Sequence, residues 1–206
     1  MALLSVSCKK KKDEDSKSGG STTTGEYYFT GTIGGVSKSF KSEVNDYDVS
    51  WTWSGIDMVS GSDTTFSETI TSNLQYGGSN DAGTTPAFGL NNSYDAVGIN
   101  NTVNLSLQFP IGTYNLSNGG NPEYTVQYFS DISGLCICSP DYTSKNLGTI
   151  TFSEVNYLGK VDWFGEKAKE YKVKGSVDCY VYNVSDPNDS IEVVGDFTLQ
   201  YQTRSY

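Results

Sequence analysis

The stretch that decides the fold reads YKVKGSVDCYVYNV over residues 171–184 and IEVVGDFTLQYQ over residues 191–202. Apolar and polar side chains alternate in both segments, which is typical of β-strands with one buried face. Between them lies the turn-forming run Ser185-Asp-Pro-Asn-Asp189. Since Asp, Asn and Pro favour tight turns, the pattern predicts a long β-hairpin.

The second strand of this hairpin carries the strongest core prediction in the chain. Its large apolar side chains recur with a spacing that points them to one side of a sheet. We expect the core to receive Val193, Phe197, Leu199 and Tyr201. A glycine interrupts the pattern near Gly195, and we interpret this as a phase slip caused by a β-bulge.

The same alternation recurs toward the N-terminus. Residues 26–40 predict a hairpin that turns at Gly34-Gly35, because glycine adopts positive φ at little cost. Further strands are predicted at residues 46–54, 66–71, 103–109, 124–129 and 148–155. No segment sustains a 3.6-residue period, so the chain is predicted to be all-β. Short strands with frequent turns favour an antiparallel β-sandwich, immunoglobulin-like or jelly-roll-like, over residues 26–206.

Composition supports one β-domain with an acidic surface. The 206 residues include 22 Gly and 15 Tyr, and only 18% are charged. The formal net charge is −10, yet residues 9–18 hold five lysines. The rest of the chain therefore carries nine Lys or Arg residues against 21 Asp or Glu residues. Because such a body repels phosphate backbones, we expect no nucleic-acid partner.

The chain contains no histidine. This excludes Ser-His-Asp and Cys-His nucleophilic catalysis and every His-ligated metal site. No motif singles out a pair of carboxylates for glycoside hydrolysis. We therefore expect a protein that is not an enzyme and has no metal and no cofactor.

The N-terminal residues resemble those of a bacterial lipoprotein. Residues 3–8 read LLSVSC, a short apolar run that ends in small residues before Cys8. We expect Cys8 to be acylated with palmitate and residues 1–8 to be the remnant of a signal peptide. Lys12-Asp-Glu-Asp15 resembles the signal that sends lipoproteins of the Bacteroidota to the cell surface. We expect residues 9–25, which are rich in Lys, Ser, Thr and Gly, to form a flexible, disordered linker.

The C-terminal half of the chain resembles small surface lipoproteins of the Bacteroidota with a β-sandwich domain of unknown function. Residues 174–182 (KGSVDCYVY) and 190–197 (SIEVVGDF) resemble the closing hairpin of these domains. Residues 110–114 (PIGTY) and 148–152 (GTITF) resemble their preceding strand starts. The resemblance implies a lipid-anchored protein on the outer membrane, whose anchor is outer-membrane lipid bound through Cys8. It supplies no functional residues.

Aromatic side chains are the candidate ligand-binding residues. Trp51 and Trp53 share a strand face with other apolar residues, which favours a core position over a sugar platform. Trp163 and Phe164 lie in a polar stretch (KVDWFGEK, residues 160–167) that we interpret as a connection between strands. An exposed aromatic pair there would suit a glycan or a protein, and the alternative is a plug folded onto the sandwich. Tyr180 and Tyr182 alternate with apolar residues, so they are either exposed or cover a second packed surface.

Three cysteines lie in the body of the chain. Cys136 and Cys138 flank Ile137, and Cys179 follows in the closing hairpin. Three thiolates without histidine make a poor zinc site, and extracellular surroundings disfavour free thiols. A disulfide between Cys179 and either Cys136 or Cys138 is one expectation, and burial as thiols is the other.

Two functions remain open from the sequence. One is a non-catalytic cell-surface module that binds a glycan or a partner protein. The other is a structural or accessory subunit of a surface assembly that has no ligand of its own. The absence of a catalytic motif fits both functions equally.

Overall fold

The computed structural model describes residues 26–44, 47–60, 63–76, 87–97, 108–117, 122–130, 134–138, 147–163 and 166–204. These residues form β-strands, in agreement with the all-β prediction. In chain order they are β1 (Tyr28–Ile33), β2 (Val36–Lys41), β3 (Tyr47–Ser60), β4 (Asp63–Tyr76), β5 (Ala87–Val97), β6 (Gly112–Asn115), β7 (Glu123–Ser130), β8 (Gly134–Cys138), β9 (Gly148–Trp163), β10 (Glu166–Asn183) and β11 (Ser190–Arg204).

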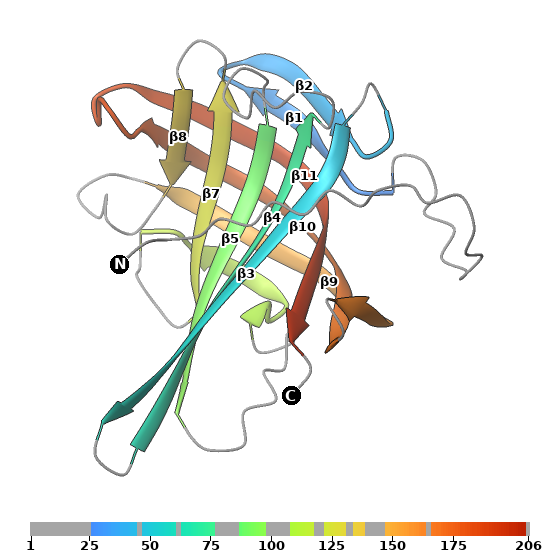
Figure 1. The fold of residues 1–206 in the computed structure, drawn as a ribbon. Coiled ribbons are helices and arrows are strands. Elements are labelled where there is room, and N and C mark those ends of the chain that lie inside the picture. Colours follow the sequence, from blue (N-terminus) through green and yellow to red (C-terminus); the bar gives the residue numbers. More distant parts are fainter. Residues whose placement is uncertain are drawn as a thin grey trace.

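The strands pack as an antiparallel sandwich of two layers, which confirms the predicted fold class (Figure 1). One layer has six strands in the order β6-β9-β10-β11-β1-β2. The other has the order β8-β7-β5-β4-β3. The layers are joined where β8 pairs with the end of β10 over Tyr182 and Asn183 alone. Such a short pairing lets the sheet fold sharply over itself.

Aromatic side chains fill the space between the layers. Phe29 on β1 stacks on Phe88 of β5 with ring centroids 4.3 Å apart, and both rings are fully buried. Tyr201 on β11 donates a hydrogen bond to the carbonyl oxygen of Leu90 on β5, at 3.1 Å. Because these contacts cross from one layer to the other, they fix the two sheets against each other. The four residues predicted for the core, Val193, Phe197, Leu199 and Tyr201, are all buried.

The predicted hairpins are present. Gly34 and Gly35 form the β1–β2 turn with φ of 58° and 74°, as expected for a tight turn that needs positive φ. The closing hairpin pairs β10 with β11 from Ala168 to Tyr182 without a break in register. Two sequence motifs that resembled strand starts pair with each other, because β6 lies beside the first residues of β9.

The predicted bulge near Gly195 is wrong. Gly195 pairs regularly with Gly31 on one side and with Val177 on the other. A Cβ atom at Gly195 would lie 2.6 Å from the carbonyl oxygen of Thr30 and 2.9 Å from the ring of Phe29. The missing side chain of Gly195 therefore allows β1 and β11 to pack closely, and the glycine does not interrupt the strand.

Two other expectations about local structure need correction. Of the strand predicted at residues 103–109, only Gln108 and Phe109 are described, and both lie outside any strand. Asn92 and Tyr124 both donate hydrogen bonds of 2.8 Å to the carbonyl oxygen of Gln108. These two side-chain hydrogen bonds hold Gln108 inside the sandwich. They satisfy its backbone carbonyl oxygen, which in a strand would accept a hydrogen bond from a neighbouring strand. The polar stretch at residues 160–167 was predicted to be a connection between strands, but its first four residues belong to β9, which continues to Trp163.

No helix among the described residues is long and apolar enough to cross a membrane.

Candidate binding surface on the β9–β10 hairpin

β9 and β10 form a long hairpin whose end projects at the lower right of Figure 1. The pairing between them contains two irregularities, one between Lys174 and Gly175 and one between Glu170 and Tyr171. At the second, Tyr171 pairs with Tyr157 and Glu170 pairs with Gly159, so Leu158 is the extra residue of a β-bulge. Gly159 has a φ of 138°, which glycine tolerates.

The inner face of this hairpin carries a row of three tyrosines. Tyr201, Tyr171 and Tyr157 lie at paired positions on β11, β10 and β9. Their exposed fractions rise along the row from 0% through 9% to 54%. Tyr157 and Tyr171 contact each other with ring centroids 5.3 Å apart. The pKa of the Tyr171 hydroxyl is raised, mainly because the group is buried and to a smaller extent because Tyr157 lies nearby. The row thus leads from the core to a solvent-exposed aromatic ring.

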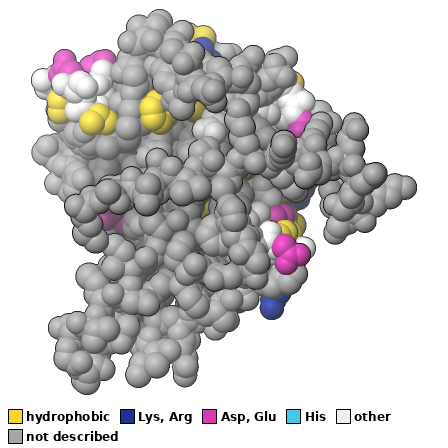
Figure 2. Space-filling model, viewed as in Figure 1, with side chains coloured by type: hydrophobic (Ala, Val, Ile, Leu, Met, Phe, Trp, Pro, Cys, Tyr) yellow, Lys and Arg dark blue, Asp and Glu magenta, His cyan; other side chains and the backbone are white. Residues whose placement is uncertain are grey.

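Leu158 adds an apolar side chain beside Tyr157. It is 44% exposed, and both residues are among the few large hydrophobic side chains on the surface of the described residues. Figure 2 shows apolar, acidic and basic side chains together at the lower right, over the end of β9. An exposed aromatic ring with polar neighbours is the arrangement that sugar rings and protein hot spots use.

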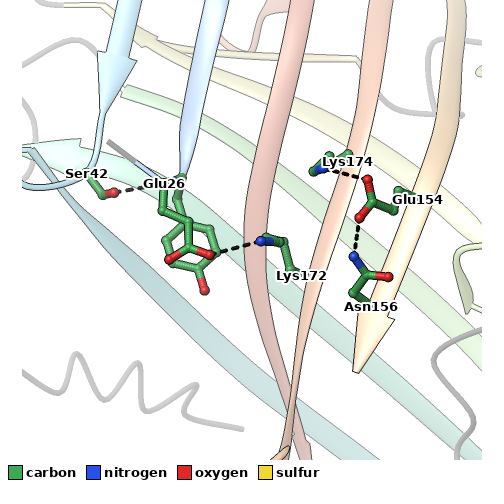
Figure 3. Close-up of polar contacts among 7 residues, drawn as sticks. Glu26, Ser42, Glu154, Asn156, Lys172 and Lys174 are labelled. Atoms are coloured by element: carbon green, nitrogen blue, oxygen red, sulfur yellow. Dashed lines mark hydrogen bonds and ion pairs between the residues drawn. The ribbon is translucent and has the colours of Figure 1, made fainter. Parts of the chain in front are cut away.

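The outer face of the same hairpin is polar and internally paired (Figure 3). The Lys174 ammonium lies 2.5 Å from a carboxylate oxygen of Glu154, and Asn156 donates a hydrogen bond to the other oxygen of that carboxylate. Lys172 forms an ion pair of 2.9 Å with Glu26. Gln202 donates a hydrogen bond of 2.9 Å to Glu170. These contacts join β9, β10, β11 and the residues before β1.

The Glu154 carboxylate on this face does not suit acid catalysis. The hydrogen bond from Lys174 lowers the pKa of Glu154, and the same bond raises the pKa of Lys174. A general acid needs a carboxyl group whose pKa is raised, so that it still holds a proton near neutral pH. Glu154 is held in the ionised form and is suited to binding or to stability.

The chain enters the sandwich at Glu26 and Tyr27, which are fixed to the body. The Tyr27 backbone N–H donates to Ser42 Oγ at 3.2 Å, and the Ser42 N–H donates to the Tyr27 carbonyl oxygen at 2.8 Å. The Tyr27 side chain is buried, and this burial raises the pKa of its hydroxyl. With the Glu26–Lys172 ion pair, these bonds hold the start of the domain beside β10.

The predicted aromatic candidates fall into different places. Trp163 is the last residue of β9, on the same hairpin as Tyr157, but its side chain lies outside the described part of the chain, as does Phe164. Tyr180 is 37% exposed on the outer face of β10. Tyr182 is buried, in keeping with the alternative that it covers a second packed surface. Trp163 and Tyr157 therefore belong to the same hairpin, six residues apart on β9, and Tyr180 and Tyr182 lie toward the opposite end of β10.

The other sequence predictions fall largely outside the described residues. Cys8 lies there, as do the side chains of Trp51 and Trp53, although β3 itself is longer than predicted. No group of three metal-ligating side chains occurs within the residues that the structure describes.

The cysteine prediction gains a geometric constraint. Cys179 is buried on β10, and Cys136 pairs in register with Asn183, four residues further along that strand. At about 3.3 Å per residue, this separates the two by roughly 13 Å, beyond the ~7 Å that a disulfide spans between Cα atoms. Because β8 runs antiparallel to β10, Cys138 lies nearer to Cys179. The disulfide itself stays a prediction.

Sequence reasoning missed Tyr157 and Leu158 for a physical reason. The bulge at Leu158 interrupts the alternation of β9 after Tyr157, so periodicity does not carry the strand on to Trp163. A signal was present in Gly159, because an isolated glycine within a strand pattern often marks a bulge.

Comparisons of this chain with protein-family models, with curated proteins and with solved structures gave no match.

Proposed function

We propose that this chain is a non-catalytic lipoprotein module of the outer-membrane surface that binds a glycan or a partner protein. The single observation that carries the binding proposal is the exposed Tyr157 ring, which contacts the buried Tyr171 at 5.3 Å between centroids. A ring that already contacts a buried neighbour on the next strand loses less conformational entropy when a ligand covers it. A sugar or an apolar protein side chain could cover such a ring.

The lipid anchor rests on the sequence. Cys8 follows a short apolar run and precedes the Lys12-Asp-Glu-Asp15 motif. Acylated Cys8 would hold the module at the outer membrane, with the linker between the lipid and Glu26. The acidic body suits a protein that remains soluble while it is held near an anionic surface.

Binding is tested on an array of neutral and acidic oligosaccharides with soluble protein that begins at residue 25. Wild-type protein is compared with Tyr157→Ala, and Tyr180→Ala is the matched control. Tyr180 is a second exposed tyrosine of the six-stranded layer, but it lies toward the other end of β10. We expect specific spots that Tyr157→Ala loses and Tyr180→Ala keeps. Equal binding by all three proteins would contradict the role of Tyr157.

The alternative function is an accessory subunit of a surface assembly, and the edge strand β3 favours it. β3 pairs with β4 over 14 residues without a bulge, and it ends the strand order of its layer. Its sequence contains no Lys, Arg or Pro. Native edges usually carry such residues to prevent strand addition. A complex that forms through β3 and is insensitive to Tyr157→Ala would support this alternative.

A further inference from the structure

The β9–β10 hairpin carries a pair of like charges at directly opposed positions. Lys160 on β9 lies directly opposite Lys169 on β10. Opposed like charges on neighbouring strands destabilise a sheet. The next pair along the hairpin is complementary, since Asp162 lies opposite Lys167. Within the described part of the chain, no hydrogen bond or ion pair joins Lys160 or Lys169 to another residue.

The bulge at Leu158 places this lysine pair on the same face as the exposed tyrosine. Lys169 lies two residues from Tyr171 on β10, so the two share a face. On β9, Tyr157 and Lys160 are three residues apart and would face opposite sides of a regular strand. Because Leu158 is an extra residue, Tyr157 pairs with Tyr171 and Lys160 pairs with Lys169, and these two β10 residues share a face. The ammonium groups and the Tyr157 ring thus belong to one surface.

The charge of the hairpin also differs from that of the rest of the chain. Residues 154–174 contain five lysines and four acidic residues. These five are among only nine Lys or Arg residues that follow residue 18, against 21 acidic residues in the same part. Two of the five, Lys172 and Lys174, are neutralised by Glu26 and Glu154. Glu166 and Glu170 alternate with Lys167 and Lys169 along β10 and so belong to its other face. On their own face, Lys160 and Lys169 therefore present positive charge beside the opposed pair of Asp162 and Lys167.

We propose that Lys160, Lys169 and Tyr157 form a binding site for an acidic glycan, a sugar chain that carries carboxylate groups. The two ammonium groups bind a carboxylate, which relieves their mutual repulsion, and a pyranose ring covers the Tyr157 ring. A neutral sugar would leave the repulsion uncompensated. This inference rests on the proposed function, because it names the ligand class of the same surface.

The test measures affinity for hexagalacturonate, cellohexaose and an acidic peptide of six glutamates by titration calorimetry. The variants are Lys160→Gln/Lys169→Gln, Tyr157→Ala and the control Lys38→Gln/Lys41→Gln, which removes two cations from β2. We expect hexagalacturonate to bind best to wild-type protein and to weaken as NaCl rises from about 0.05 M to about 0.5 M. The Lys160/Lys169 variant should lose roughly 10- to 100-fold in affinity, the range for charged hydrogen bonds. The β2 control should bind like wild type.

The outcomes separate this inference from the proposed function. If Tyr157→Ala weakens binding of cellohexaose or the peptide while the lysine variant does not, the surface binds a ligand and the acidic-glycan inference is overturned. If hexagalacturonate binds equally well to all variants, both proposals fail. The melting temperature of the lysine variant should equal or exceed that of wild type, because a repulsive pair is removed. A lower melting temperature would show that the lysines stabilise the fold and would contradict the inference.

Discussion

Tyr157 and Tyr171 contact each other with ring centroids 5.3 Å apart, although one ring is largely exposed and the other is buried. The pair joins the interior of the sandwich to its surface. Tyr171 belongs to the fold, whereas the outer side of Tyr157 is open to a ligand. The two residues should therefore respond differently to substitution.

Truncation of the two tyrosines separates their roles. Tyr171→Ala empties a buried aromatic site and should lower the free energy of unfolding by roughly 3–5 kcal/mol. Tyr157→Ala removes a half-exposed ring and should cost no more than about 1 kcal/mol. Urea denaturation followed by far-UV circular dichroism measures both values. Similar losses in the two variants would mean that Tyr157 is a core residue and would remove the main candidate for ligand contact.

Substitution of Gly195 tests the close packing of β1 against β11. In Gly195→Ala, the added Cβ would meet the Thr30 carbonyl oxygen and the Phe29 ring. Such overpacking should cost on the order of 1–3 kcal/mol and lower the melting temperature. Gly35→Asn is the control, because no atom lies within 4 Å of a Cβ there and Asn tolerates its positive φ. An unchanged melting temperature in Gly195→Ala would show that the strands have room to separate.

The Glu154–Lys174 pair should give the fold a specific dependence on acid. The hydrogen bond from Lys174 lowers the pKa of Glu154 from its ordinary value of 4.5. A depressed pKa contributes stability above the unfolded value, and this stability is lost as the pH falls through the folded value. The melting temperature of Glu154→Gln should thus lie below that of wild type at pH 7, and the difference should shrink below pH 4.5. Lys174→Gln should behave in the same way, and a difference that grows in acid would contradict the assignment.

Acylation of Cys8 is tested by metabolic labelling with palmitate in the cells that make the protein. The full-length protein, expressed with its native signal, should incorporate the label and partition into detergent. Cys8→Ala should lose both properties, because the thiol is the attachment point. Label that persists in Cys8→Ala would refute the lipid anchor and the proposed location.

Regular alternation allowed much of the fold to be predicted, and irregular backbone explains the failures. Phe197, Leu199 and Tyr201 were predicted for the core because their strand pairs without a break. The extension of β9 was missed because a bulge changes which residues share a face. At Gly195 the sequence predicts a bulge, but the strand is regular there. A strand glycine that makes room for a neighbouring backbone has the same sequence signal as one that forms a bulge.

The candidate site was harder to predict than the fold. Trp163 lies on the same hairpin as Tyr157, and its role in binding stays a prediction. The opposition of Lys160 and Lys169 depends on the pairing register. Local sequence does not determine that register once a bulge is present. The ion pair between Glu26 and Lys172 joins residues 146 positions apart, which no local pattern indicates.

The central claim is that the end of the β9–β10 hairpin is the ligand-binding surface. The most direct measurement is hydrogen exchange of wild-type protein with and without the best-binding oligosaccharide from the array, read by mass spectrometry at saturating ligand. We expect slower exchange in peptides that cover residues 156–171, and no change in peptides that cover the β10–β11 turn at residues 184–189. Protection that is confined to the turn or to β3, with none on the hairpin, would contradict it.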